Sequence, residues 1–112
     1  MKYEHTPVML EEVLEYLGPG QGEFFVDCTL GGGGYTIAVA KKIGAKGKVL
    51  AIDLDKLAIK NTQEVIKKNK NKNIILAHDN FKNLSKIVKK YFQKETRFNG
   101  IVFDFSFITM IR

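Results

Sequence analysis

The sequence has almost no cysteine, no long apolar run and no apolar N-terminal segment. Its single cysteine, Cys28, has no partner for an internal disulfide and cannot build a metal site alone. The longest apolar stretch, residues 101–111, is interrupted by Asp104 and is about half the roughly 20 residues that cross a bilayer. Acidic residues, beginning with Glu4, stand where a signal peptide would be apolar. These absences argue against a disulfide scaffold and a membrane span, and we expect a cytoplasmic protein.

The rest of the composition is typical of one globular domain over residues 1–112. Hydrophobic residues make up 45% of the chain and charged residues 27%. The net charge of +6 is unevenly distributed, because residues 1–35 sum to −5 and residues 36–112 sum to +11. The basic part could attract a polyanion such as nucleic acid. It could equally coat solvated helix faces, as lysine runs such as residues 67–72 usually do.

Apolar periodicity predicts alternating helices and strands. Thr6 and Pro7 have the types preferred at an N-cap and a first helical position, and Asp55 can cap a later helix. Glycines that follow residues 17 and 43 favour helix ends there. We expect helices over residues 7–17, 35–43, from 56 onward and 82–93, and strands over residues 24–26, 48–53, 73–77 and 100–105.

Apolar strands separated by helices predict an α/β fold with a parallel sheet covered on both faces. Right-handed crossovers then give a doubly wound sheet of about four strands, most simply in the order 3-2-1-4. Ligands of such sheets bind beyond the carboxyl ends of the strands. The candidate site residues are therefore those that follow each strand, in residues 27–35, Asp53, residues 78–81 and Asp104.

A run of four glycines follows the first predicted strand and precedes a helix. Glycine lets the backbone approach a ligand, and a helix N-terminus offers free N–H groups. A dinucleotide-binding loop has the pattern G-x-G-x-x-G, and its third glycine is missing here whether the pattern begins at Gly31 or at Gly32. A Walker A loop requires a lysine directly after its glycines, and no lysine directly follows these. The remaining pattern, Asp27 with Gly31 and Gly33, suits a ligand with a cationic amino-acid end and no phosphates. S-adenosylmethionine has such an end.

Several residues near the ends of the other predicted strands have two possible roles. Asp53 can accept both ribose hydroxyl hydrogens of a nucleoside, or it can cap the following helix, a role that also suits Asp55. Phe81 can stack on an adenine ring or belong to the core. Asp79 can cap the helix that begins near residue 82. Asp104 interrupts an apolar run, so it is either a costly buried charge or a site residue, and we favour the site.

The remaining polar candidates are weaker. His5 and His78 lack the spacing of a metal pair, and His5 is better interpreted as a polar group near the cleft. Cys28 is expected to pack in the core and not to act in catalysis. Tyr35 could line a cofactor pocket or shield it. No metal site is expected.

Three segments together resemble a known family. Residues 5–14 (HTPVMLEEVL), 26–34 (VDCTLGGGG) and 51–55 (AIDLD) are similar to the bacterial 16S rRNA cytosine-N4 methyltransferases, known as RsmH or MraW. The similarity runs from about His5 to Asp104. It implies the class I fold of S-adenosylmethionine-dependent methyltransferases, and methyl transfer to the exocyclic N4 of a cytidine in small-subunit rRNA.

The resemblance also assigns roles to individual residues. Asp104 would lie near the methyl group, and we assign it either to accepting an amino hydrogen of the cytidine as charge develops or to orienting the amino group of the cofactor. The family usually has His where this chain has Tyr35, so a backbone contact there survives but an imidazole contact does not. The other implied cofactor contacts are the methionine end at Gly33, Gly34 and Tyr35, the ribose at Asp53 and the adenine side at Phe81.

The sequence departs from the family after Asp104. The family continues with a Leu-Gly-Val-Ser-Ser-like segment, whereas residues 105–112 here read FSFITMIR. Family members are much longer and carry an inserted helical substrate domain, so the chain looks like an N-terminal portion. Without the later strands, the strand at 100–105 would be an exposed edge, and we expect a homodimer through that edge and the tail. The alternatives are an inactive fragment that self-associates and a Lys-rich RNA-binding module.

Overall fold

Helices and strands alternate along the chain as the apolar pattern predicts. The structure is a computed structural model that describes residues 10–28, 34–104 and 107–110. The helices are α1 (Leu10–Leu17), α2 (Gly34–Ile43), α3 (Lys56–Asn69) and α4 (Leu84–Tyr91), with a 3-10 helix, η1 (Phe81–Asn83), before α4. The strands are β1 (Phe24–Asp27), β2 (Lys48–Asp53), β3 (Ile74–His78), β4 (Gly100–Asp104) and β5 (Phe107–Met110).

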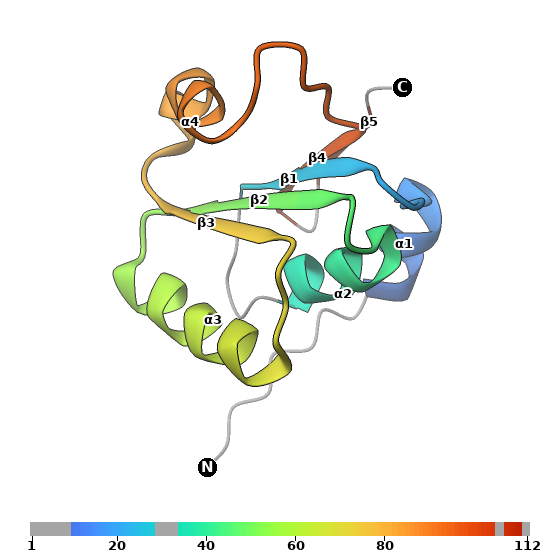
Figure 1. Ribbon diagram of the computed structural model, residues 1–112, viewed down its shortest axis with the longest axis horizontal. Coiled ribbons are helices and arrows are strands. Elements are labelled where there is room, and N and C mark those ends of the chain that lie inside the picture. The colour runs from blue at the N-terminus through green and yellow to red at the C-terminus, as the bar shows by residue number, and fades with distance from the viewer. Residues whose placement is uncertain (1–9, 29–33, 105–106, 111–112) are drawn as a thin grey trace.

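The strands form one sheet in the order β3-β2-β1-β4-β5 (Figure 1). The first four are parallel, which confirms the predicted doubly wound α/β arrangement and its 3-2-1-4 order. Asp27 at the end of β1 is in register with Ala51 of β2 and Val102 of β4. The carboxyl ends of the parallel strands therefore lie along one edge of the sheet.

The fifth strand corrects one expectation. β5 pairs antiparallel with β4, so Gly100 lies opposite Met110 and Val102 lies opposite Ile108. The strand at residues 100–104 is thus not the exposed edge that the sequence led us to expect. Because that edge was the basis for the expected homodimer, the structure gives the dimer no support.

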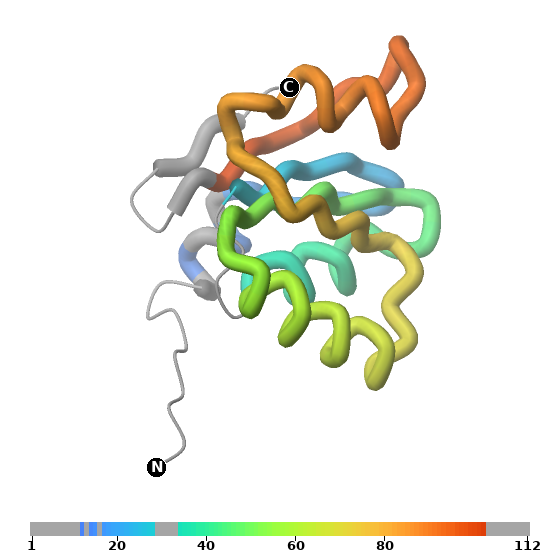
Figure 2. The backbone as a smooth tube through the Cα atoms, turned by 90° about the vertical axis from the view of Figure 1, so that its left-hand side faces the viewer, coloured from blue at the N-terminus to red at the C-terminus, as the bar shows by residue number. Residues whose placement is uncertain are grey.

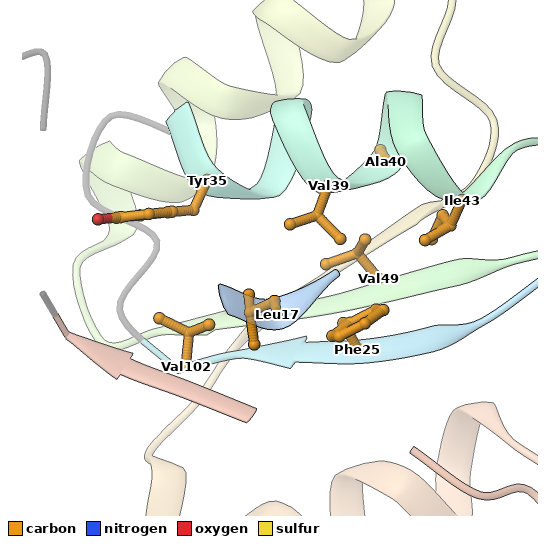
Figure 3. Packing of buried hydrophobic residues seen from close by; sticks show 8 residues of the cluster. All are labelled: Leu17, Phe25, Tyr35, Val39, Ala40, Ile43, Val49 and Val102. Atoms are coloured by element: carbon orange, nitrogen blue, oxygen red, sulfur yellow. The ribbon is translucent and has the colours of Figure 1, made fainter. Parts of the chain in front are cut away.

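Helices cover both faces of the sheet. Figure 2 shows α4 on one side and α2 and α3 on the other, and α1 lies on the α2 side in Figure 1. The core on the α2 side joins residues of α1, α2 and three strands, namely Leu17, Phe25, Tyr35, Val39, Ala40, Ile43, Val49 and Val102 (Figure 3). The core on the α4 side contains Val26, Leu50, Ile52, Ala77 and Ile87.

Local signals explain where several elements begin. The Asp55 carboxylate accepts a hydrogen bond from the N–H of Leu57 at 2.9 Å, which confirms it as the N-cap of α3. The prediction that Asp79 caps the next helix is wrong. The side chain of Asn80 accepts from the N–H of Lys82 instead, and the chain makes a 3-10 turn before α4.

Within the described ranges, no helix is both long enough and apolar enough to cross a bilayer.

Candidate functional site

Acidic residues end three of the four parallel strands. Asp27 ends β1, Asp53 ends β2 and Asp104 ends β4, while His78 ends β3 opposite Asp53. Asp53 is two residues beyond Ala51, the register partner of Asp27, and side chains alternate along a strand. The carboxylates of Asp27 and Asp53 are therefore on the same face of the sheet, which is the face that α2 covers. The backbone of Asp104 lies at the same edge, and its side chain is outside the described part of the structure.

Asp27 is a buried carboxylate, with 3% of its surface exposed. The hydroxyl of Thr36, which is fully buried, donates a hydrogen bond to Oδ2 of Asp27 at 2.7 Å. A buried charge is costly without such partners, so this bond helps to stabilise the carboxylate at the end of β1. Thr36 lies in the first turn of α2, on the far side of the glycine run.

The glycine run itself is only partly described. Gly34 is exposed and is the first residue of α2. Gly31 and Gly33 lie outside the described residues. The structure therefore confirms that a helix begins directly after the run, and the roles of these glycines stay predictions.

Tyr35 packs in the core between α2 and the sheet. It is 5% exposed, and Figure 3 shows its ring extending from α2 past Val102. Burial raises the pKa of the Tyr35 hydroxyl, and the negative charges of Asp27 and Glu12 raise it further. The phenol therefore stays protonated at neutral pH and lies within the electrostatic reach of Asp27.

Asp53 does not cap α3. Its Oδ1 accepts a hydrogen bond from the N–H of Asp55 at 2.8 Å, and Asp55 in turn caps the helix. The half-buried Asp53 side chain is thereby oriented at the end of β2 by a local turn. Its backbone carbonyl also accepts from the N–H of Asp79 at 3.1 Å, which ties the end of β2 to the segment after β3.

The segment after β3 carries Phe81 at the start of η1. Phe81 is 38% exposed and does not belong to the buried clusters, which argues against the alternative that it is a core residue. Just before it, Oδ1 of Asp79 accepts hydrogen bonds from the side chain of Asn83 and the backbone of Asn80. These two bonds, the Asn83 one foremost, lower the pKa of Asp79.

Among the described residues, Cys28 and His78 do not form a reactive group. Cys28 is half-buried on the α4 side, and burial, with a smaller contribution from the charge of Asp27, raises its pKa to about 12. Such a thiol is not ionised at neutral pH, as expected for a packing residue. His78 is exposed, with its Nε2 2.9 Å from the carbonyl oxygen of Leu54. His5 lies outside the described residues, and no cluster of three metal-ligating side chains occurs among those described.

A cavity of about 600 Å³ lies on the α4 side of the sheet. It is lined by α4 and the loop that follows it, including Val88, Phe92 and Phe98, and by none of the predicted site residues. The space beside Asp27 and Thr36 is only about 10 Å³, enough for one water at most. Among the described residues, the Asp27 carboxylate is thus closely packed at the end of β1.

Sequence reasoning missed Thr36. A hydroxyl residue in the first turn after a glycine run was the available signal, because Ser and Thr hydroxyls bond to polar groups near helix starts. Its actual partner, Asp27, is nine residues away in the preceding strand. The prediction would have required knowing how closely α2 approaches the end of β1.

Solved structures that are similar to this one include methyltransferases. An rRNA methylase from Streptococcus thermophilus shares the fold, with a TM-score of 0.66 and 21% identity over 89% of this chain and 55% of that one. A SAM-dependent methyltransferase from Aquifex aeolicus is 31% identical, with a TM-score of 0.54 over 62% of this chain and 39% of that one. The fold is thus the Rossmann-like fold found in such methyltransferases.

Sequence comparison identifies the family more narrowly. Residues 2–110 match the model of the MraW methylase family, and the chain belongs to that family. The Ribosomal RNA small subunit methyltransferase H of Clostridium botulinum is 38% identical over 104 residues, which cover 93% of this chain and 32% of that protein. The chain therefore spans about a third of the length of the curated relatives it matches.

Proposed function

We propose that this chain forms the S-adenosylmethionine-binding part of a methyltransferase that modifies the exocyclic N4 of a cytidine in 16S rRNA. Membership of the MraW methylase family and the likeness to Ribosomal RNA small subunit methyltransferase H support this proposal. The observation that carries it is the buried carboxylate of Asp27 at the end of β1, followed by the glycine run and α2, with Asp53 on the same face at the end of β2.

The residues fit the chemistry of this cofactor. A buried carboxylate at the strand end suits a cationic amino-acid group and would repel a pyrophosphate. Asp27 with Gly31, Gly33, Gly34 and Tyr35 would hold the methionine end. Asp53 would accept hydrogen bonds from the ribose hydroxyls, and the exposed ring of Phe81 would lie against the adenine. When bound, the cofactor supplies a methyl group on a positively charged sulfur.

Asp104 is the proposed catalytic residue. The N4 lone pair of cytosine is delocalised into the ring, so the amino group is a poor nucleophile. A carboxylate that accepts one of its hydrogens increases the electron density on nitrogen as charge develops. The end of β4 places the backbone of Asp104 at the same edge as Asp27 and Asp53, where such a group is needed.

The proposed partner is 16S rRNA or the small ribosomal subunit. Binding an extruded base requires a shaped pocket and a basic surface around it. Since this chain spans 32% of the relative's length, we assign cofactor binding to it and much of the RNA surface to the remainder of such proteins. A homodimer is not part of the proposal, because β5 covers the β4 edge on which that expectation depended.

Calorimetry with S-adenosylhomocysteine tests the proposal. The chain should bind this product analogue, and Asp53→Ala should weaken binding about tenfold or more, because hydrogen bonds to a charged group are lost. Asp55→Asn is the matched control, since it removes a neighbouring charge but keeps the cap of α3. Absence of binding by the unmodified chain, or equal losses in both variants, would contradict the proposal.

A second candidate function is that of a Lys-rich RNA-binding module. It is favoured by the exposed lysines of two helices, which are Lys56, Lys60, Lys67 and Lys68 in α3 and Lys86, Lys89 and Lys90 in α4. Such a module should bind RNA with an affinity that falls steeply with salt and does not change when S-adenosylhomocysteine is added. Fluorescence anisotropy with a labelled RNA at several salt concentrations separates the two functions.

A further inference from the structure

The hydrogen bond between Thr36 and Asp27 connects two elements across the glycine run. Asp27 is the last residue of β1, and Thr36 is the third residue of α2. The bond is 2.7 Å long, and both side chains are almost completely removed from solvent. A short bond in such surroundings is strong, because water does not compete for either group.

This bond also determines how the carboxylate is oriented. A carboxylate has two oxygens and can rotate about the bond that joins it to its Cβ atom. Because the Thr36 hydroxyl holds Oδ2, that rotation is restricted, and the position of Oδ1 is determined as well. The donor itself is held firmly, since Thr36 is fully buried beside Val39 and Ala40 in α2.

We propose that Thr36 is a positioning residue, which orients the Asp27 carboxylate toward the α-amino group of S-adenosylmethionine. The inference rests on the proposed function and deepens it, because it assigns the amino-acid end of the ligand to a pair of residues. Thr36 touches neither the ligand nor the reacting atoms. It acts through Asp27, and it would also keep the start of α2 at a fixed distance from the end of β1.

A purely structural role for Thr36 makes a different prediction. If the hydroxyl served only to stabilise the fold, its removal would affect every ligand of the site equally. If it orients Asp27, its removal should weaken only ligands that have the amino-acid end. The nucleoside end is assigned to Asp53, at the end of β2, and to Phe81, which follows β3, so neither residue belongs to α2.

The experiment compares two ligands by calorimetry on the full chain. S-adenosylhomocysteine has the amino-acid end, and 5′-methylthioadenosine lacks it. Thr36→Val keeps the shape of the side chain but removes the hydroxyl. It should weaken S-adenosylhomocysteine about tenfold and leave methylthioadenosine within about twofold. Thr36→Ser keeps the hydroxyl and should bind both ligands within about threefold of the unmodified chain.

A second pair of variants covers the case in which Thr36→Val does not fold, as judged by circular dichroism. Thr36→Ser and Thr36→Ala differ only in the hydroxyl, so the same selective loss is expected between them. Parallel losses of both ligands, or no loss of either, would overturn the positioning role. If the unmodified chain binds neither ligand, the proposed function fails and the inference fails with it. If the unmodified chain binds both ligands and the variants without the Thr36 hydroxyl show no selective loss, the proposed function stands and the inference alone fails.

Discussion

At the scale of single residues, buried polar side chains connect elements that are far apart in sequence. Asn73, which is 8% exposed, donates from Nδ2 to the carbonyl of Ala40 at 2.8 Å and to that of Gly44 at 2.9 Å. Carbonyl groups at the end of a helix have no partner within the helix. The amide of Asn73 therefore supplies the partners that α2 lacks at its C-terminus, and it does so from the residue just before β3.

Replacing Asn73 with Ala should lower the free energy of unfolding by about 1–3 kcal/mol, because it leaves buried carbonyl groups without their donor. Asn69→Ala is the matched control. Asn69 is exposed at the end of α3, and its replacement should change stability by less than about 0.5 kcal/mol. Urea denaturation followed by circular dichroism measures both values. Similar changes in stability in the two variants would contradict the conclusion that Asn73 supplies the hydrogen-bond partners at the end of α2.

The pKa of Cys28 leads to a prediction about reactivity. Alkylation requires the thiolate, and a shift of the pKa from 9.0 to about 12 lowers the thiolate fraction at pH 8 by about a thousandfold. Iodoacetamide should therefore modify the native chain far more slowly than the chain in denaturant. The native rate should keep rising with pH above 9, where the denatured rate levels off. Mass spectrometry measures both rates, and equal rates at pH 8 would show that the thiol is not buried as described.

At the scale of elements, local signals in the sequence predicted most boundaries. The strand predicted over residues 48–53 is β2 to the residue, because a short apolar run between two helices suits a strand that is covered on both faces. The predicted helix over residues 82–93 is instead η1 followed by α4, since Asn80 caps a 3-10 turn first. β5 was missed entirely. Its pairing with β4 depends on a tertiary contact that no local pattern reports.

The candidate site shows the same difference between contacts that are local in the sequence and contacts that depend on how the elements pack. The cap at Asp55 was predictable because its partner, the N–H of Leu57, is two residues away. The positions of Asp27 and Asp53 at one edge followed from strand order alone. The contact between Thr36 and Asp27 was not predictable, because it depends on how α2 packs against β1. Topology could thus be predicted, and the orientation of individual side chains could not.

The N-cap of α3 offers a test at this scale. Asp55→Ala should lower the free energy of unfolding by about 1 kcal/mol, because the N–H of Leu57 loses its acceptor. Asp55→Asn keeps an acceptor oxygen at the same place and should lose less than half as much. Thermal unfolding of the three proteins gives the comparison. An Asn variant as unstable as the Ala variant would indicate that charge, and not the hydrogen bond, is what matters.

At the scale of the whole molecule, β5 determines which edges of the sheet are open. The order β3-β2-β1-β4-β5 places β3 at one edge and β5 at the other, so β4 is an internal strand. Exposed strand edges present unpaired N–H and C=O groups to other molecules. The antiparallel pairing of residues 107–110 therefore protects the backbone of β4.

Replacing residues 107–110 with a Gly-Ser sequence of equal length should expose the β4 edge and promote self-association. We expect the average mass of the variant to rise with concentration by more than that of the unmodified chain. Size-exclusion chromatography with light scattering at several concentrations makes the comparison. Replacing residues 93–96, which lie in the loop before β4, is the control and should not alter the mass. If the variant with residues 107–110 replaced stays monomeric at every concentration, β4 does not need β5 beside it to prevent self-association.

The central strand also affects how the chain can fold during its synthesis. The N–H of Phe24 donates to the side chain of Asn99, 75 residues later, and the N–H of Asn99 donates to the carbonyl of Phe24. At about 5–20 residues per second, a ribosome adds those residues in about 4–15 seconds. Once β2 has been made, β1 can pair with it on one side, but the other side of β1 has no partner until β4 follows. A nascent chain of this protein must therefore keep its middle strand half-paired until translation reaches β4.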